Sequence, residues 1–435
     1  MYYINIILFS ALVIPYTAIY IKRNKLTPVS TFLVMEMSMF YGICFYRGNT
    51  SIKGNSEVGI KLETIYVVAL FFFILGVEFA KRVKMSKGVS RATSWGNGTD
   101  DYFVDKPLNS TQRLIMWAMI AVSIAACLYL LSKAGTNLLL RALQDLIRND
   151  SNTYRDERMS FGSVPGIGYI YQFRVVILPL LTTYVVFAEK RLPVFFRYAL
   201  LVLMVFFILC TGQRNAFVFY CAILFFYYVF MKKTYGITLV SRKMIIIGVS
   251  VAFGLLLIMT VANGRVAESD NIFSAAVSSI VDRVFFVNQG SALTCFGYIE
   301  TQDTVWGYDW LQMLRQILPG KIDYLPVDNI SYMIEYGTDA GTNPPCLWGS
   351  AWYNFYIIGV TIYPFIIGIF YQRLYMKAKN TMYKNRMYIL LYVALCVYLG
   401  IWTYGTPMTL FNQGVITVLL MRWLICKFPC RKTKL

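Results

Sequence analysis

Arg214 is the residue of this chain whose position points most directly to chemistry. It lies within 195–231, a block that is apolar apart from Arg197 near its start and a few small polar residues. A helix of that length, at ~1.5 Å per residue, would reach over ~50 Å, whereas the hydrocarbon core of a membrane is ~30 Å thick. The chain must therefore bend, and we predict the bend at 211–215, Thr-Gly-Gln-Arg-Asn. A charge there is unfavourable unless it reaches water or a partner, so we interpret Arg214 as a functional cation at a membrane surface.

The composition is that of a helical membrane protein. Of the residues, 57% are hydrophobic and only 14% are charged, and apolar runs of membrane-spanning length recur from end to end. We predict an all-α polytopic membrane protein, a single membrane domain over 1–435 with about 11 transmembrane helices. The predicted spans are 3–21, 29–46, 64–80, 113–132, 166–188, 195–211, 215–231, 244–262, 351–371, 388–405 and 410–427.

The net charge of +19 is explained by orientation in the membrane. If the basic stretch 22–25 is cytoplasmic and the sides alternate from there, the cytoplasmic segments hold 26 of the 41 Lys and Arg residues. The N-terminus is then expected outside and the C-terminus inside, with the first span retained rather than cleaved as a signal peptide. The excess of basic residues indicates contact with anionic membrane lipid, and it does not imply a nucleic-acid partner.

Two long loops are expected on the outer face, at 133–165 and 263–350. Within the second loop, 272–287 and 308–317 have the pattern of amphipathic helices that could lie on the membrane surface. Long loops in a compact membrane protein usually carry function. We therefore expect the chemistry on the outer face, where the turn at 211–215 also lies in this topology.

Further arginines join Arg214 on that side. Arg174 lies about two turns into a span, and charges inside spans usually face a water-filled cavity. The outer loops add Arg155, Arg158, Arg265, Arg283 and Arg315. Converging guanidinium groups suit a phosphate or pyrophosphate, because the planar group binds two oxygens at once. The alternative is that each arginine reaches lipid headgroups.

The cysteines and the absence of histidine limit other chemistry. Cys295 and Cys346 fall in the same outer loop and could pair if that compartment is oxidising. The chain has no histidine, so a zinc site is not expected near its cysteines. No Asp-x-Asp pair lies on the outer side, and we expect neither a metal nor another cofactor.

Several short motifs resemble those of the Wzy family of O-antigen and enterobacterial common antigen polymerases. The turn Thr211-Gly212-Gln213-Arg214-Asn215 is similar to the Gly-Thr-Arg-Ala-Asn type of turn in that family. The later stretch is similar in motif order and contains Arg283, Gly307-Tyr308-Asp309-Trp310, Arg315, Leu318-Pro319-Gly320, Gly341-Thr342-Asn343-Pro344, Gly349, Tyr353-Asn354 and Gly359. The resemblance covers roughly 166–370 in motif order, and the whole chain in span number and loop sizes.

The resemblance implies a GT-C-like polysaccharide polymerase of the bacterial inner membrane. Such enzymes transfer the growing glycan from undecaprenyl pyrophosphate to the non-reducing end of a new repeat unit, also carried on undecaprenyl pyrophosphate, at the periplasmic face. A polysaccharide chain-length regulator is an implied partner. Arg214 with Arg315, and Arg283 or Arg174, would then stabilise the pyrophosphate without a metal. Arg155, Arg158, Arg265, Tyr353 and Asn354 are the further residues expected to bind substrate.

The general base and the sugar-binding residues stay open at this stage. Without histidine a carboxylate must accept the proton of the acceptor hydroxyl, if a base is used at all. The candidates are Asp282, Asp309, Asp323, Asp328 and Glu335, of which Asp309 lies within a motif of the resemblance. Aromatic residues of the outer loops could stack on sugars or form the interfacial aromatic belt, namely Trp306, Trp310, Tyr332 and Trp352.

Two other functions compete with this interpretation. A lipid-linked oligosaccharide flippase or other transporter would use the same substrate, but flippases of this pathway have short loops and repeated halves. An O-antigen ligase performs related chemistry, but that family carries a histidine in its large outer loop. Reconstitution with lipid-linked repeat units separates elongation from transport.

Overall fold

The described part of the chain is all-helical. The computed structural model describes residues 3–48, 56–83, 107–141, 161–162, 164–262, 286–318, 324–337, 341–379, 381 and 385–427. Within these ranges eight helices are long and apolar enough to cross a membrane: Ile4–Asn24, Pro28–Tyr46, Glu57–Arg82, Ser110–Ala134, Ile167–Ala188, Arg214–Tyr235, Cys346–Lys379 and Arg386–Tyr404. This is consistent with a multi-pass membrane protein.

Eight of the eleven predicted spans thus correspond to helices of spanning length. The other three coincide with shorter apolar helices, Val194–Leu209, Lys243–Ile258 and Val415–Cys426. The first of these has 16 residues. Such a helix is about 24 Å long, which is less than the ~30 Å of a typical hydrocarbon core. The number of spans therefore stays a prediction.

The chain divides into two compact units, each built from segments distant in sequence. Unit 1 comprises Met1–Trp95, Val281–Thr381 and Cys396–Gln413, and unit 2 comprises Gly96–Ile280, Met382–Leu395 and Gly414–Leu435. The helices of unit 1 are α1 (Ile4–Asn24), α2 (Pro28–Gly48), α3 (Ser56–Arg82), α13 (Asn288–Ile299), α14 (Tyr308–Arg315), α15 (Val327–Tyr336), α16 (Cys346–Lys379), the 3₁₀ turn Trp402–Tyr404 and α18 (Met408–Asn412). Those of unit 2 are α4 (Ser110–Ala134), α7 (Ile167–Tyr171), a π-helical segment (Gln172–Ile177), α8 (Leu178–Ala188), α9 (Val194–Leu209), α10 (Arg214–Tyr235), α11 (Arg242–Ala262), α19 (Val415–Met421) and a second π-helical segment (Arg422–Lys427). The division falls within α17 (Arg386–Ile401).

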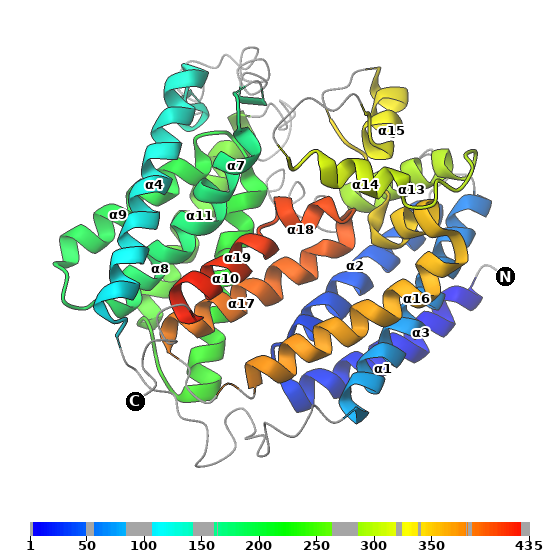
Figure 1. Ribbon diagram of the computed structural model, residues 1–435, viewed down its shortest axis with the longest axis horizontal. Helices are drawn as coiled ribbons and strands as arrows, with labels where there is room; N and C mark the ends of the chain where they lie inside the picture. Colours follow the sequence, from blue (N-terminus) through cyan, green and yellow to red (C-terminus); the bar gives the residue numbers. More distant parts are fainter. Residues whose placement is uncertain are drawn as a thin grey trace. The chain divides into compact units, whose positions relative to one another are not determined.

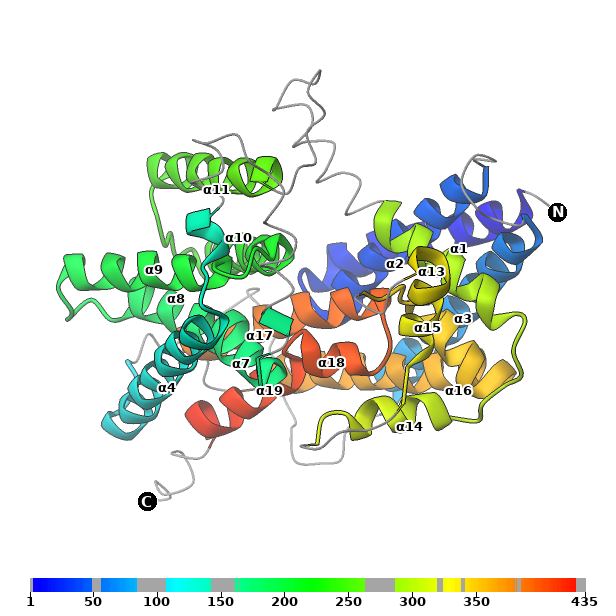
Figure 2. The ribbon, with the colours of Figure 1, turned by 90° about the horizontal axis from the view of Figure 1, so that it is seen from above.

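Unit 1 is a bundle of long helices covered at one end by short ones. Helices α1, α2, α3 and α16 lie side by side, and α13, α14 and α15 gather at the end where α16 begins (Figures 1 and 2). Two glycines let α3 and α16 approach closely. A Cβ atom at Gly76 would lie 2.1 Å from Phe365 O, and one at Gly368 would lie 2.2 Å from Phe73 O. Small residues at such crossings are how membrane helices pack backbone against backbone.

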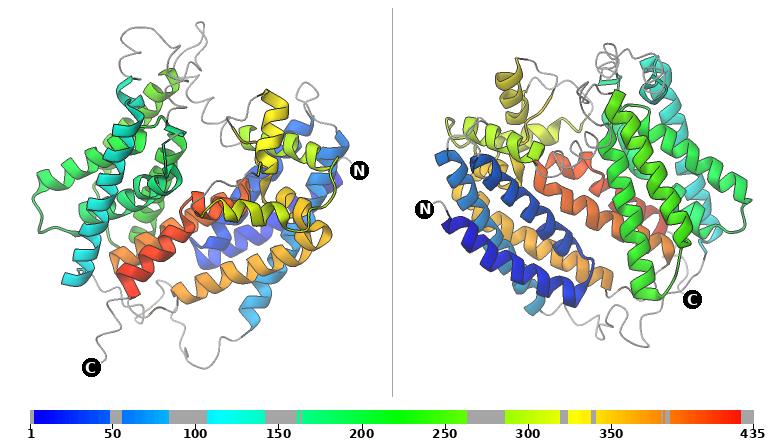
Figure 3. Two further views of the ribbon diagram at one scale, coloured as in Figure 1. Left: turned by 45° about the horizontal axis from the view of Figure 1, so that its top comes forward. Right: turned by 180° about the vertical axis from the view of Figure 1, so that it is seen from behind.

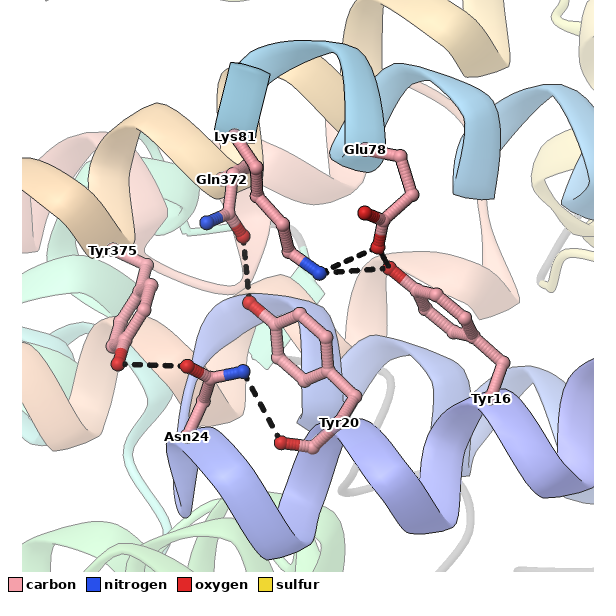
Figure 4. A network of polar contacts seen from close by, with 7 residues as sticks. All are labelled: Tyr16, Tyr20, Asn24, Glu78, Lys81, Gln372 and Tyr375. Atoms are coloured by element: carbon pink, nitrogen blue, oxygen red, sulfur yellow. Dashed lines mark hydrogen bonds and ion pairs between the residues drawn. The ribbon is translucent and has the colours of Figure 1, made fainter. Parts of the chain in front are cut away.

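Hydrogen bonds at the ends of α1 and α3 fasten this bundle. Tyr16 Oη donates to Glu78 Oε1 at 2.6 Å, and Tyr20 Oη donates to Gln372 Oε1 of α16 at 2.6 Å (Figure 4). Tyr375 Oη of α16 donates to Asn24 Oδ1 at 3.2 Å. Each tyrosine thus ties α1 to a neighbouring helix, which fixes the bundle that carries α16.

Unit 2 is organised around α8, whose residues are buried along most of its length. Helices α4 and α9 pack against α8, and α10 packs against both α9 and α11 (Figure 3). Polar side chains tie the last segments of the chain to this group. Gln112 Nε2 of α4 donates to Ile425 O at 2.8 Å, and Thr417 Oγ1 of α19 donates to Gln172 Oε1 at 2.7 Å. These contacts hold the segment that carries Arg174.

Candidate functional site

The turn that carries Arg214 lies between α9 and α10 in unit 2. Helix α9 ends at Leu209 and α10 begins at Arg214, so the bend spans 210–213. The structure places it slightly earlier than the predicted 211–215, and Arg214 and Asn215 belong to the first turn of α10. Gly212 makes the turn possible because its φ is 70°, in the left-handed region that side chains disfavour. The half-buried Arg214 therefore stands at the N-terminal end of a 22-residue helix.

Arg174 holds this turn in place. Its side chain is only 1% exposed. Its Nη1 donates to Ile208 O at 2.8 Å and to Phe207 O at 3.3 Å, and its Nη2 donates to Gln213 Oε1 at 2.9 Å. A cation at the C-terminal end of a helix satisfies carbonyls that lack intrahelical partners. Arg174 thus joins the end of α9 to the residue directly before Arg214.

The start of the segment after α4 packs on the same turn. Leu138 N donates to Cys210 O at 2.8 Å, and Asn137 Oδ1 accepts from Leu139 N at 3.0 Å. Among the described residues, the buried Thr211 Oγ1 and Arg174 Nε have no hydrogen-bond partner. Buried polar atoms are nearly always satisfied, by protein, by water or by a ligand. The turn therefore keeps unused hydrogen-bonding capacity beside Arg214.

These features make the turn suited to an anion. The N-terminal end of a helix carries partial positive charge and unpaired N–H groups. Arg214 adds a guanidinium group at that position, which can bind two phosphate oxygens at once. A turn held from behind by Arg174 needs little rearrangement to bind, and preorganised donors stabilise developing charge best.

A second polar cluster lies in unit 1, where α16 is kinked. Tyr356 interrupts the helix with φ 50° and ψ −130°. The interruption leaves carbonyl groups of α16 without helical partners, and N–H groups of the segment before α14 donate to them. Val305 N donates to Tyr353 O at 3.2 Å, and Gly307 N donates to Asn354 O at 2.8 Å. The side chain of Asn354 adds a contact, because its Oδ1 accepts from Trp310 N at 3.2 Å. The kink of α16 thereby positions the start of α14.

Asp309, in the first turn of α14, is completely buried. Its Oδ1 accepts from Tyr324 Oη at 2.7 Å and from Val327 N at 3.3 Å. Its Oδ2 is buried without a hydrogen-bond partner among the described residues. Burial raises the pKa of Asp309, and the hydrogen bonds from Tyr324 and Val327 oppose that rise in part. Asp309 is thus a carboxyl group with one oxygen held and the other available for a proton.

Asp328 is a second carboxyl group whose pKa is raised, in part by the charge of Asp309. Burial, together with the nearby charge of Asp309, raises the pKa of Asp328 from its ordinary value of 3.8 to about 6. The Gly-Thr-Asn-Pro motif positions the same segment, since Asn343 N donates to Asp328 O at 2.9 Å and Asn343 Nδ2 donates to Glu335 Oε2 at 2.6 Å. A carboxyl group whose pKa is raised toward neutral pH by burial and by a neighbouring carboxylate is typical of acid–base sites.

The structure distributes the predicted site residues between the two units. Arg174 and Arg214 belong to unit 2, whereas Asp309, Arg315 and Asn354 belong to unit 1. Arg315 lies at the exposed end of α14, where its Nη1 donates to Gln312 Oε1 at 3.3 Å. Asn354 is fully buried, and both ends of its amide are used within the protein, with Nδ2 donating to Ser350 O at 3.0 Å.

Several predicted residues lie outside the described ranges. They are Arg155, Arg158, Arg265 and Arg283, the candidate bases Asp282 and Asp323, and most of the predicted helix 272–287. The helix expected at 308–317 is present as α14. Cys295 and Cys346, which could have paired, are both buried free thiols.

Of the aromatic residues considered for sugar stacking, some are exposed and others are buried in the protein. Trp306 is 70% exposed, and Tyr332 is half-buried with its ring centroid 4.5 Å from that of Tyr336. Trp310 is buried and donates from Nε1 to Ser350 Oγ at 2.7 Å. Trp352 is half-buried and donates to Glu300 Oε1 at 3.2 Å. Stacking on a sugar is therefore open to Trp306 and closed to Trp310.

Sequence reasoning missed two buried carboxyl groups in unit 1. Glu36 lies within α2, is fully buried and accepts a hydrogen bond from Trp348 Nε1 at 2.9 Å. Glu63, expected in a loop before a span, lies inside α3 and is also fully buried. The signal that could have found Glu36 is an acid in the middle of an apolar run. In the described ranges no three Cys, Asp or Glu side chains are grouped closely enough to hold a metal ion.

Comparison with protein-family models, with curated proteins and with solved structures finds no match to this chain. Its function is therefore inferred from its own residues and their contacts.

Proposed function

We propose that the chain is a polymerase of lipid-linked glycan repeat units in the bacterial inner membrane. It would transfer the growing glycan from undecaprenyl pyrophosphate to the non-reducing end of a new repeat unit, at the periplasmic face. The observation that carries the proposal is the Arg174-supported turn that presents Arg214 at the start of α10. A cationic helix start held in this way suits the pyrophosphate leaving group of that reaction.

The reaction needs charge stabilisation at the leaving group. A hydroxyl of the acceptor sugar attacks the anomeric carbon, the bond from that carbon to the pyrophosphate oxygen breaks, and the lipid pyrophosphate departs with the bonding electrons. Arg214 would bind two of its oxygens through the planar guanidinium group. Arg174 is then a positioning residue, since it is buried and its donors are used by the turn. The arginines, and not a metal ion, neutralise the developing charge in this proposal.

The proton of the attacking hydroxyl needs an acceptor. Asp328 is the best supported of the predicted bases, because it is half-buried and its pKa of about 6 lies near neutral pH. Asp309 is completely buried and would act by raising the pKa of Asp328. Arg315, exposed at the end of α14, remains a candidate for binding a substrate phosphate.

One observation favours a different function. Glu36 is a fully buried carboxyl group inside a candidate membrane span, where acidic residues often mark the path of an ion or a proton. Its Oε1 has no hydrogen-bond partner among the described residues. An ion-coupled flippase for the same lipid-linked oligosaccharide is therefore the second candidate function.

Reconstitution in vesicles with purified lipid-linked repeat units distinguishes the two functions. With a chelator present and no ion gradient, the polymerase proposal expects a ladder of longer glycans. Arg214→Ala should abolish the ladder at unchanged protein level, and Arg214→Lys should restore only part of it, because an ammonium group cannot bind two oxygens in the bidentate manner. Arg373→Ala, which removes an exposed arginine of α16, is the matched control and should elongate normally. Full activity of Arg214→Ala overturns the assignment of this turn, and gradient-dependent movement of the unit without elongation favours the flippase.

A further inference from the structure

A basic pocket lies in unit 2 where α4 and α17 begin and α8 ends. Its volume is about 200 Å³, and its charged lining consists of Arg113, Glu189, Lys190, Arg191 and Arg386. Four cations and one carboxylate leave an excess of three positive charges. The N-terminal ends of α4 and α17 add partial positive charge at the same place. The pocket is therefore built for an anion.

The internal contacts of the pocket use only part of this charge. Arg113 Nε lies 3.2 Å from Oε1 of the buried Glu189, and Arg386 Nη1 donates to Phe187 O at 3.0 Å. Lys190 and Arg191 are exposed, and no ion pair or hydrogen bond of their side chains is present within the described ranges. These two cations are free to bind an added anion.

An apolar face of α9 begins four residues after Arg191. It is formed by Phe195, Tyr198, Ala199, Val202, Leu203 and Phe206. Phe195 is 84% exposed, the highest value among the large apolar side chains that the structure describes. The rings of Trp117 and Phe196, 6.0 Å apart, join α4 to α9, and Trp117 lies one turn after Arg113 on the same face of α4. The cations Lys190 and Arg191 therefore directly precede the helix that carries the apolar face.

We propose that this surface binds one anionic phospholipid, with its phosphate in the basic pocket and an acyl chain along α9. The pocket volume of about 200 Å³ is smaller than the ~300–1,000 Å³ typical of pockets for drug-sized molecules, so it suits a small headgroup. Basic pockets between membrane helices bind anionic headgroups through the same combination of arginine and lysine. The apolar face of α9 would have no role in binding a soluble phosphate, whereas the acyl chain of a lipid can pack on it. The site is separate from the Arg214 turn, so it does not depend on the proposed function.

The test measures lipid affinity of the full chain in a neutral detergent. Native mass spectrometry gives apparent dissociation constants for phosphatidylglycerol and for phosphatidylcholine, and the anionic lipid should bind more tightly. Lys190→Gln with Arg191→Gln should weaken phosphatidylglycerol binding about tenfold or more, since each basic residue near the membrane contributes on the order of 1 kcal/mol. The matched control is Lys22→Gln with Arg23→Gln, one exposed lysine and one exposed arginine at the end of α1, which should leave the affinity unchanged.

A second pair of variants tests the acyl chain. Phe195→Ala should weaken binding of long-chain phosphatidylglycerol several-fold, whereas Phe225→Ala, an exposed phenylalanine of α10, should have no effect. The proposal is overturned if the two charge variants weaken binding equally, or if phosphatidylcholine binds as tightly as phosphatidylglycerol. It is also overturned if glycerol 3-phosphate competes as strongly as the lipid, because the site would then belong to a soluble phosphate. Equal affinities of the Phe195→Ala and Phe225→Ala variants for phosphatidylglycerol would contradict the placement of the acyl chain along α9.

Discussion

Both units bury charged side chains, and the surroundings of Arg174 in unit 2 differ from those of Asp309 in unit 1. In unit 2, Arg174 is 1% exposed and its Nη1 and Nη2 donate to two carbonyls and one amide oxygen. In unit 1, Asp309 is fully buried, and among the described residues only one of its two oxygens accepts hydrogen bonds. A guanidinium group cannot lose its proton in a protein, whereas a buried carboxyl group can gain one.

The difference shows how each charge can serve function. Arg174 must stay ionised, so its surroundings have to supply acceptors, and those acceptors come from the turn that presents Arg214. Asp309 can be neutral, and its charge state acts on the neighbouring Asp328. The buried Arg174 therefore fixes the conformation of the turn before Arg214, and the buried Asp309 contributes to the raised pKa of Asp328. Substitutions of three residues, Arg174, Asp309 and Asp328, test this contrast.

The largest effect is expected for Arg174→Ala. The substitution leaves two carbonyls of α9 and the Gln213 amide without their charged donor, and hydrogen bonds to charged groups contribute about 1.5–3 kcal/mol each. We expect a loss of about 3 kcal/mol or more in the free energy of unfolding, measured by thermal melting in detergent. Arg197→Ala, which removes a single bond to Val186 O, is the control and should lose much less. Equal losses would mean that Arg174 does not fix the turn.

A smaller effect is expected for substitutions of Asp309. Asp309→Ala leaves Tyr324 Oη and Val327 N without their acceptor, which should cost about 2 kcal/mol. Asp309→Asn keeps an oxygen in nearly the same place and should melt close to the wild type. Its elongation rate should nevertheless change, because the charge that acts on Asp328 is gone. If the Asn variant both melts and elongates as the wild type does, Asp309 has no role in setting the pKa of its neighbour.

The smallest effect is a change in pH dependence through Asp328. Its pKa of about 6 in the folded protein exceeds the ordinary value of 3.8, so the folded state binds the proton more tightly. This stabilisation is fully present below about pH 4 and is lost as the pH rises through about 6. Asp328→Asn should therefore flatten the melting temperature between these pH values. Elongation by the wild type should fall as the pH drops through 6, and a profile without that fall would argue against Asp328 as the base.

Apolar patterning was enough to predict much of the fold. Eight helices of membrane-spanning length, a bend that overlaps the predicted 211–215 and the helix α14 all follow from local sequence. The π-helical segment around Arg174 and the kink at Tyr356 were not predicted, because both depend on partners distant in the chain. Glu63 shows the same limit, since an acid near an expected loop is buried in a helix by packing that its neighbours in sequence do not reveal.

The candidate site was predicted less completely than the fold. Residue type and the adjacent turn marked Arg214, but the partners of Arg174 became visible only through the carbonyls at the end of α9. The choice of Asp328 among five possible bases rests on its burial beside Asp309, and those residues are 19 positions apart in sequence. Spacing alone carries no information about such a pair.

In the proposed reaction the start of α10 binds pyrophosphate through Arg214. The most direct test is the affinity of the purified chain for an isoprenyl pyrophosphate in detergent with a chelator present, compared with the corresponding monophosphate. Arg214→Lys should weaken pyrophosphate binding about tenfold and Arg214→Ala about a hundredfold, with a smaller change for the monophosphate. Equal pyrophosphate affinities for the wild type and Arg214→Ala would contradict the claim.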